Sequence, residues 1–398
     1  MRGGKGRFLG LSRTVVVLGF VSLLTDISSE GIYPLIPLFL VEVLKTQIVA
    51  VGLIEGVANS TASLLRIFSG WLSDVLGNRK WLTATGYALS MVSKPVLSIS
   101  NSWQAVFGIR FADRLGKGIR TAPRDALIAD SAPAEQRGVS FGFHRAMDTV
   151  GAVTGPLLAF WLLRSLAYGY RTIFLLSAIP AALGVLILII FIREPRCERP
   201  AHAERPSLTL KGFSREFKLF LLAATVFSIG NSSDVFLILR ARNVGIAAAS
   251  VLLVYVVFNI VEASLSMWAG ALSDRVGRRN VILAGYVVYA VVYAGFGLAR
   301  SPSTVWALFA LYGVHNALTQ SVQRAFAADL CCAGARGTGL GAFHTLTGVA
   351  LLPASLIAGY LWQAVSPSAP FYFGAAMALI STVLLAICCR QGAICTAT

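Results

Sequence analysis

The stretch Gly70-Trp71-Leu72-Ser73-Asp74-Val75-Leu76-Gly77-Asn78-Arg79-Lys80 returns 200 positions later as Gly270-Ala271-Leu272-Ser273-Asp274-Arg275-Val276-Gly277-Arg278-Arg279-Asn280. Both copies follow a long apolar run and precede another. A short charged segment between two such runs is typical of a turn where the chain leaves one membrane span and enters the next. Its recurrence at half the length of a 398-residue chain indicates two copies of one structural unit.

The composition places the chain in a membrane. Hydrophobic residues make up 56% of it and charged residues only 13%, with a mean hydropathy of +0.72. A water-soluble domain of ordinary composition cannot bury that much apolar surface. We therefore predict an all-α membrane protein with twelve transmembrane helices in two six-helix pseudo-symmetric halves. A helix crosses roughly 30 Å of hydrocarbon with about 20 apolar residues, and such runs cover residues 14–40, 48–73, 80–100, 103–125, 137–164, 172–193, 217–241, 247–273, 281–299, 303–328, 336–363 and 370–390.

One polar, proline-rich segment divides the chain. We predict an N-terminal half at residues 1–193, a cytoplasmic linker at 194–216 and a C-terminal half at 217–398. The repeat extends beyond the turns, because Asn59 and Asn259 share the same offset.

The net charge of +16 is distributed over alternate loops. Lys and Arg concentrate on the cytoplasmic side of membrane proteins, so this pattern predicts an inner-membrane, multi-pass protein with both termini in the cytoplasm. A lipid bilayer is then the expected surrounding, and a nucleic-acid partner is not expected. Asp26 and Glu30 interrupt the first apolar run, which favours a retained helix over a signal peptide. The cytoplasmic side receives the N-terminal tail, the segments 73–80, 120–137, 193–218 and 274–279, and Arg390.

The sequence gives no support for an enzyme, a cofactor or a metal site. The adjacent pairs Cys331-Cys332 and Cys388-Cys389 lack zinc-like spacing and a nearby histidine. Neither a Walker sequence nor a hydrolase or metalloprotease motif is present. We expect no catalytic residues.

The repeated Gly-x-x-x-Asp-x-x-Gly-x-Arg turn resembles the major facilitator superfamily, and the resemblance covers essentially the whole chain. It implies a transporter whose turns latch one conformation on the cytoplasmic side. An alternative is that these charges only set topology and turn shape. The candidate gate residues are Gly70, Asp74, Gly77, Arg79, Gly270, Asp274, Gly277 and Arg279.

Two further motifs carry the resemblance. In the fifth run, Gly142, Gly151, Gly155 and Pro156 resemble a motif of exporters that exchange substrate for protons, although Ala159 and Phe160 replace its two trailing glycines. In the fourth run, Arg110, Gly116 and Gly118 fit a family pattern. Asp113 and Arg114 stand where the family usually has Gln and Gly, so this chain adds two charges to the membrane interior.

Charged residues within the apolar runs are the candidate functional residues, because an ionisable group in the bilayer is costly unless it is paired or hydrated. Asp26 lies about thirteen residues after Arg13, roughly 20 Å along a helix and near the midplane. Asp26 and Glu30 are the first candidates for proton coupling, whereas Asp113 and Asp148 have cationic neighbours and suit structural pairing equally well. The candidate proton-coupling or cavity residues are Asp26, Glu30, Arg110, Asp113, Arg114, Lys117, His144, Arg145, Asp148 and Asp234.

We predict a secondary active transporter that exports a small organic molecule in exchange for protons by alternating access, acting as a monomer. Two alternatives stay open. The basic group of Arg110, Arg114, Lys117 and Arg145 suits uptake or exchange of an anionic metabolite. A protein of a different class, a membrane sensor or scaffold that binds a ligand without moving it, has the same pattern of spans.

Overall fold

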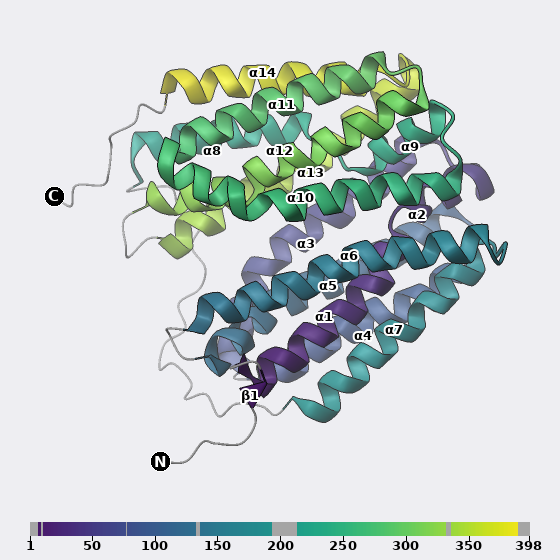
Figure 1. The fold of residues 1–398 in the computed structure, drawn as a ribbon, viewed down its shortest axis with the longest axis vertical. Coiled ribbons are helices and arrows are strands. Elements are labelled where there is room, and N and C mark those ends of the chain that lie inside the picture. The colour runs from purple at the N-terminus through teal and green to yellow at the C-terminus, as the bar shows by residue number, and fades with distance from the viewer. Residues whose placement is uncertain are drawn as a thin grey trace. The chain divides into compact units, whose positions relative to one another are not determined.

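The computed structural model describes residues 7–8, 11–76, 78–132, 136–192, 213–331 and 336–388. Two short antiparallel strands, β1 (Arg7–Phe8) and β2 (Leu11–Ser12), precede a chain of helices (Figure 1). The first helices are α1 (Arg13–Ile32), α2 (Leu35–Leu38), the π-helix η1 (Phe39–Val43), α3 (Ile48–Leu76), α4 (Arg79–Ser98), α5 (Trp103–Ser131), α6 (Arg137–Arg164) and α7 (Tyr170–Phe191). Then follow α8 (Arg215–Gly230), α9 (Val235–Asn243), α10 (Ala248–Val276), α11 (Arg278–Leu298), α12 (Pro302–Asp329), α13 (Arg336–Ala364) and α14 (Ala369–Cys388).

These helices confirm the twelve predicted spans. The first span consists of α1, α2 and η1, the seventh of α8 and α9, and each other span of one helix. Within the described residues, nine helical segments are long and apolar enough to cross a membrane by length and composition alone. The spans formed by α4, α5 and α12 are not among them. Polar side chains inside the membrane therefore concentrate on particular helices.

The first and seventh spans are both interrupted. Pro34 has no backbone N–H to continue a helix, and α1 ends two residues before it, with the Tyr33 N–H donating to the Ser29 carbonyl at 3.0 Å. In the seventh span, α8 ends at Gly230 and α9 begins at Val235. Pro34 thus explains the break in the first span, while the break in the seventh carries the polar sequence Asn231 to Asp234.

The chain forms two compact units: residues 1–39 with 61–205, and residues 40–60 with 206–398. The hydrophobic core of the first unit is built from β2, α1, α4, α5 and α7, with Leu18, Tyr87 and Leu188 fully or almost fully buried. The second unit has an aromatic core in which Phe227 stacks on Tyr286 at 4.1 Å between ring centroids. The division of the chain at residues 193 and 217 stays a prediction based on the repeat.

Residues 48–60 of α3 belong to the second unit because they pack closely on α13. A Cβ at Gly52 would lie 2.4 Å from the Ser355 carbonyl oxygen, so only glycine allows this approach. Nearby, the Ser60 hydroxyl donates to the Gly348 carbonyl at 2.8 Å.

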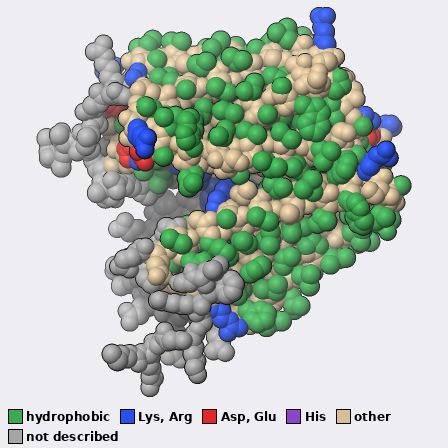
Figure 2. Space-filling model, in the orientation of Figure 1, with side chains coloured by type: hydrophobic (Ala, Val, Ile, Leu, Met, Phe, Trp, Pro, Cys, Tyr) green, Lys and Arg blue, Asp and Glu red, His purple; other side chains and the backbone are tan. Residues whose placement is uncertain are grey.

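The outer surface of the helices is apolar. Figure 2 shows hydrophobic side chains over most of the described surface that it draws. Met267, with 86% of its surface exposed, and Trp268, with 58%, are extreme cases. Large apolar side chains exposed in this number suit helices that face lipid acyl chains rather than water.

Glycines of α6 bring α1 against it. A Cβ at Gly155 would lie 2.5 Å from the Ile27 carbonyl oxygen, and one at Gly151 would lie 2.7 Å from Cβ of Asp26. The two helix backbones therefore touch along one face. Gly142, the first glycine of the same motif, has no such neighbour within 4 Å.

Gly155→Val is expected to destabilise the protein by about 1–3 kcal/mol or more, because the added carbons meet backbone atoms that cannot move independently. The measurement is thermal unfolding of the purified protein in detergent. Gly142→Val is the matched control, since it adds the same side chain where there is open space. An equal fall in melting temperature for both variants would contradict the close packing of α1 on α6.

Candidate functional site: a charged pocket in the first unit

A charged pocket lies among α1, α4 and α5. The empty space among its side chains, about 390 Å³, includes open solvent. Three cations and two carboxylates contribute to its wall, together with hydroxyl and apolar side chains. The lining residues are Ser29, Glu30, Ile32, Tyr33, Ile36, Ser93, Lys94, Leu97, Ile109, Arg110, Asp113 and Arg114.

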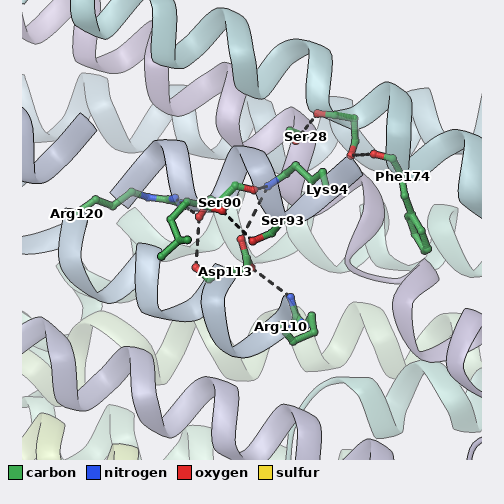
Figure 3. A network of polar contacts seen from close by, with 10 residues as sticks. Ser28, Ser90, Ser93, Lys94, Arg110, Asp113, Arg120 and Phe174 are labelled. Carbon is green, nitrogen blue, oxygen red and sulfur yellow. Dashed lines mark hydrogen bonds and ion pairs between the residues drawn. The ribbon is translucent and has the colours of Figure 1, made fainter. Parts of the chain in front are cut away.

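Asp113 is the centre of an ion-pair network on one side of this pocket (Figure 3). Its two carboxylate oxygens face different cations: Oδ1 lies 3.9 Å from Nζ of Lys94, and Oδ2 accepts from Nη1 of Arg110 at 3.4 Å. Lys94 also donates to the Ser90 carbonyl at 2.8 Å. Lys94 is 2% exposed and Arg110 4%. Buried charges of this kind require close partners, and Asp113 supplies one to each.

Arg120 joins the same network. In the sequence it lies where the fourth apolar run, 103–125, overlaps the predicted cytoplasmic segment 120–137. Its Nη1 donates to Oγ of Ser90 at 2.7 Å, and its guanidinium lies 4.4 Å from the ring centre of Tyr87. The helices α4 and α5 approach closely here, because a Cβ at Gly86 would lie 2.6 Å from the Gly116 carbonyl oxygen. Helix α5 continues to Ser131, which keeps Arg120 inside the bundle.

Tyr33 faces two arginines of α5. The guanidinium carbons of Arg110 and Arg114 lie 5.8 Å and 5.9 Å from the centre of its ring. Cations at this distance over an aromatic face are attracted by its electrons. In the described part of the chain, Nε of Arg114 is buried and has no hydrogen-bond partner. The sequence does not reveal this contact, because Tyr33 and Arg114 are far apart along the chain.

The candidate proton-coupling residues of α1 lie in the same unit. Glu30 lines the pocket, whereas Asp26 lies one turn away, against Gly151 of α6. The charges of Glu30, Asp148 and Lys117 act on Asp26. Lys117, which does not line the pocket, thus lies within electrostatic reach of both acidic residues of α1. The structure brings the predicted acidic pair next to cations of α5.

The predicted site residues of α6 are His144, Arg145 and Asp148. Nδ1 of His144 lies 3.5 Å from Oδ2 of Asp148, and the other carboxylate oxygen accepts a hydrogen bond from Ser22 of α1. Arg145 is exposed and is not part of the pocket wall. Asp148 therefore contacts His144 within α6 and joins α6 to α1 through Ser22.

Asp234 is the one candidate proton-coupling or cavity residue in the second unit. It lies in the break between α8 and α9, where Oδ1 accepts from the hydroxyl of Tyr312 at 2.7 Å. Beside it, the Tyr289 hydroxyl donates to the Gly230 carbonyl at 3.0 Å. The aromatic core of this unit thus supplies hydroxyl groups to the interrupted seventh span.

The second copy of the repeated turn is described in full. Helix α10 ends at Val276, and Gly277 has φ +92°, a backbone conformation that favours glycine. Arg278 pairs with Asp329 at the end of α12 at 2.6 Å and with Asp274 at 3.4 Å. Arg279 donates to the Leu385 carbonyl of α14 at 3.3 Å. Gly270 has no neighbour within 4 Å of a Cβ placed on it.

The first copy makes corresponding contacts. Arg79 pairs with Asp130 at the end of α5, and Lys80 donates to the Ile189 carbonyl of α7 at 2.9 Å. Arg79 and Asp130 are 51 positions apart, as are Arg278 and Asp329. Each turn is therefore fastened to the fourth and sixth spans of its own half. Gly77, the surroundings of Gly70 and the side chain of Asp74 lie outside the described residues, and the gating role stays a prediction.

Comparison with known proteins identifies the family. The sequence model described as Major Facilitator Superfamily matches residues 18–240 and again 219–391. The chain belongs to this superfamily. It is 38% identical over 384 residues to an uncharacterized MFS-type transporter of Methanocaldococcus jannaschii, covering 94% of each chain. It is also 24% identical over 344 residues to the multidrug resistance protein MdtH of Cronobacter sakazakii, covering 84% of this chain and 80% of that one.

Solved structures confirm the superfamily fold. The nucleoside transporter NupG matches with a TM-score of 0.80 at 13% identity, over 95% of this chain and 100% of that one. A POT family transporter in complex with 5-aminolevulinic acid matches with a TM-score of 0.82 at 14% identity, over 96% and 97%. The chain is thus a multi-pass membrane protein of a transporter family.

Proposed function

We propose that this chain is a secondary transporter that exports a small organic molecule across the inner membrane in exchange for protons, by alternating access and as a monomer. The observation that carries the proposal is the pocket among α1, α4 and α5, where Glu30 and Asp113 line one wall with three cations. Charged groups are costly inside a bilayer and are usually retained where they bind a substrate or carry protons. The multidrug resistance name of the MdtH relative supports export.

Asp26 and Glu30 are the proposed proton carriers. Both lie on α1, and the charge of Lys117 acts on both. A carboxylate that lies near a cation and near other carboxylates is balanced between its charged and neutral forms. Such a group is able to load and release a proton as its access to water changes. Asp113 is assigned instead to structural pairing, because it forms ion pairs with Lys94 and Arg110, one at each carboxylate oxygen.

The topology that goes with this proposal has both termini and the 194–216 linker in the cytoplasm. The repeated turns then lie on the cytoplasmic side as the proposed gate. Their contacts within each half support a further part in gating. Each turn fixes the ends of three helices to one another, so that a half moves as a unit. The excess of cations in the pocket wall keeps uptake or exchange of an anionic metabolite as the second candidate.

The test is accumulation of labelled small organic molecules in liposomes that contain the purified protein. With an acidic lumen, exchange for protons drives a substrate inward, whereas cotransport with protons requires an acidic exterior. We expect accumulation with the acidic lumen only. Protein-free liposomes control for passive entry of weak acids and bases. Accumulation with an acidic exterior would favour uptake instead, and binding without any flux would favour the sensor.

A further inference from the structure

Arg114 differs from the other cations of the pocket in the partners it has. Lys94 and Arg110 each face one oxygen of Asp113. The charge of Asp113 also acts on Arg114, although its two carboxylate oxygens face Lys94 and Arg110. Arg114 contacts the ring of Tyr33, and its buried Nε has no hydrogen-bond acceptor in the described part of the chain. A buried donor without an acceptor is costly, so this position favours a ligand that supplies one.

The charges of the wall indicate the charge of that ligand. Lys94, Arg110 and Arg114 face the pocket together with two carboxylates, Glu30 and Asp113. With both carboxylates ionised, one positive charge remains in excess. A ligand with a single negative charge neutralises the pocket, whereas a dianion or a cation leaves a net charge in a region from which the bilayer excludes water.

The remaining wall indicates the rest of the ligand. Ile32, Ile36, Leu97 and Ile109 line the pocket, and apolar walls bind the hydrocarbon part of a ligand. The planar guanidinium of an arginine matches the geometry of a carboxylate.

We propose that Arg114 binds the carboxylate of the transported molecule, and that the substrates are small organic monocarboxylates with an apolar body. The proposal rests on the transport function proposed above and names the substrate class of the same pocket. It concerns a residue at which this chain departs from the usual pattern of the fourth span, since Arg114 stands where glycine is usual. Tyr33 orients the guanidinium by lying against it.

The experiment compares probes that have the same shape and differ in charge. Benzoate, benzamide and benzylamine, and hexanoate, hexanamide and hexylamine, are added at millimolar concentration to the purified full-length protein, and the melting temperature is measured. We expect the carboxylates to raise the melting temperature of the wild type more than the amides or amines. Equal shifts within each set, or no shift with either carboxylate, would overturn the proposal.

Three variants locate the effect. In Arg114→Gln, carboxylate binding is expected to weaken about tenfold or more, the usual effect of losing a hydrogen bond to a charged group. Arg114→Lys keeps the charge and is expected to keep the preference for carboxylates at reduced affinity. Arg164→Gln, an exposed arginine at the end of α6, is expected to bind as the wild type does. Unchanged carboxylate binding in Arg114→Gln, or loss of the preference in Arg114→Lys when the protein elutes as the wild type does, would contradict the assignment.

This binding measurement needs no gradient, so it is independent of proton coupling. A carboxylate preference without gradient-driven flux would overturn the proposed coupling and support the substrate class. Gradient-driven flux of neutral or cationic compounds, without that preference, would overturn the substrate class and support the transport function.

Discussion

Asp113→Ala is expected to destabilise the protein by about 3–5 kcal/mol, because removing one partner leaves buried charges uncompensated. Lys94 and Arg110 are at most 4% exposed and both face the Asp113 carboxylate. Thermal or chemical unfolding of the purified protein measures the effect, which we expect to be among the largest of any single charged residue in the described chain.

Asp329→Ala is the matched control for this prediction. Asp329 also pairs with an arginine, Arg278, but its side chain is 53% exposed. Exposed ion pairs contribute about 0–1 kcal/mol, so little change is expected. The double variant Lys94→Ala with Asp113→Ala is expected to cost less than the two single variants added together, since it removes both members of one pair. Asp113→Ala with no greater effect than Asp329→Ala would contradict the network.

The sequence was sufficient for the fold because the determinants of the fold are local. A repeat of one turn and apolar runs of membrane length predict twelve spans, and the structure confirms them. Helix α5 ends later than the apolar run on which its prediction is based. In a sequence, a helix end that carries charged residues resembles a loop. Only the packing of α4 on α5 shows that Arg120 is inside the bundle.

The site was predicted in part. The i, i+3, i+4, i+7 spacing on α5 predicts one charged face, and three of its four residues line the pocket: Arg110, Asp113 and Arg114, but not Lys117. Lys94 and Tyr33 come from other helices, and their sequence positions say nothing about distance from Asp113 or Arg114. A single lysine near the end of an apolar run, or a single tyrosine, is too common to be a signal. The glycine contacts at Gly86 and Gly116 bring α4, and with it Lys94, close to α5.

The repeated turn shows a similar limit. Its duplication predicts two equivalent turns, and both are fastened in the same way, by one cation to a carboxylate and by the next to helix-end carbonyls. The partners Asp130 and Asp329 lie outside the motif. The motif therefore identifies the arginines of each turn, whereas their carboxylate partners are known only from the fold.

The double variant Asp26→Asn with Glu30→Gln is expected to lose proton-driven accumulation entirely. A gradient of one pH unit supports about tenfold accumulation for each proton exchanged, because one pH unit corresponds to about 1.4 kcal/mol. Without a group that carries the proton, this ratio falls to about one. The substitutions preserve the shape of both side chains and remove their charge and their ability to titrate.

Exchange of labelled for unlabelled substrate across the same membrane, with no pH gradient, is the control for this variant. Such exchange needs binding and alternating access but no net proton movement. We expect the double variant to retain it at a substantial fraction of the wild-type rate. Loss of both activities would indicate that Asp26 and Glu30 bind substrate or stabilise α1 rather than carry protons.

Proton movement driven by substrate is the measurement that tests the proposed function most directly. Liposomes contain the protein and a pH-sensitive dye, potassium and valinomycin hold the voltage at zero, and a substrate from the accumulation assay is added outside. The account predicts that the lumen becomes alkaline with the wild type as protons leave in exchange, and that its pH stays constant with the Asp26→Asn, Glu30→Gln protein. Entry of labelled substrate into wild-type liposomes without a rise in lumenal pH would contradict it.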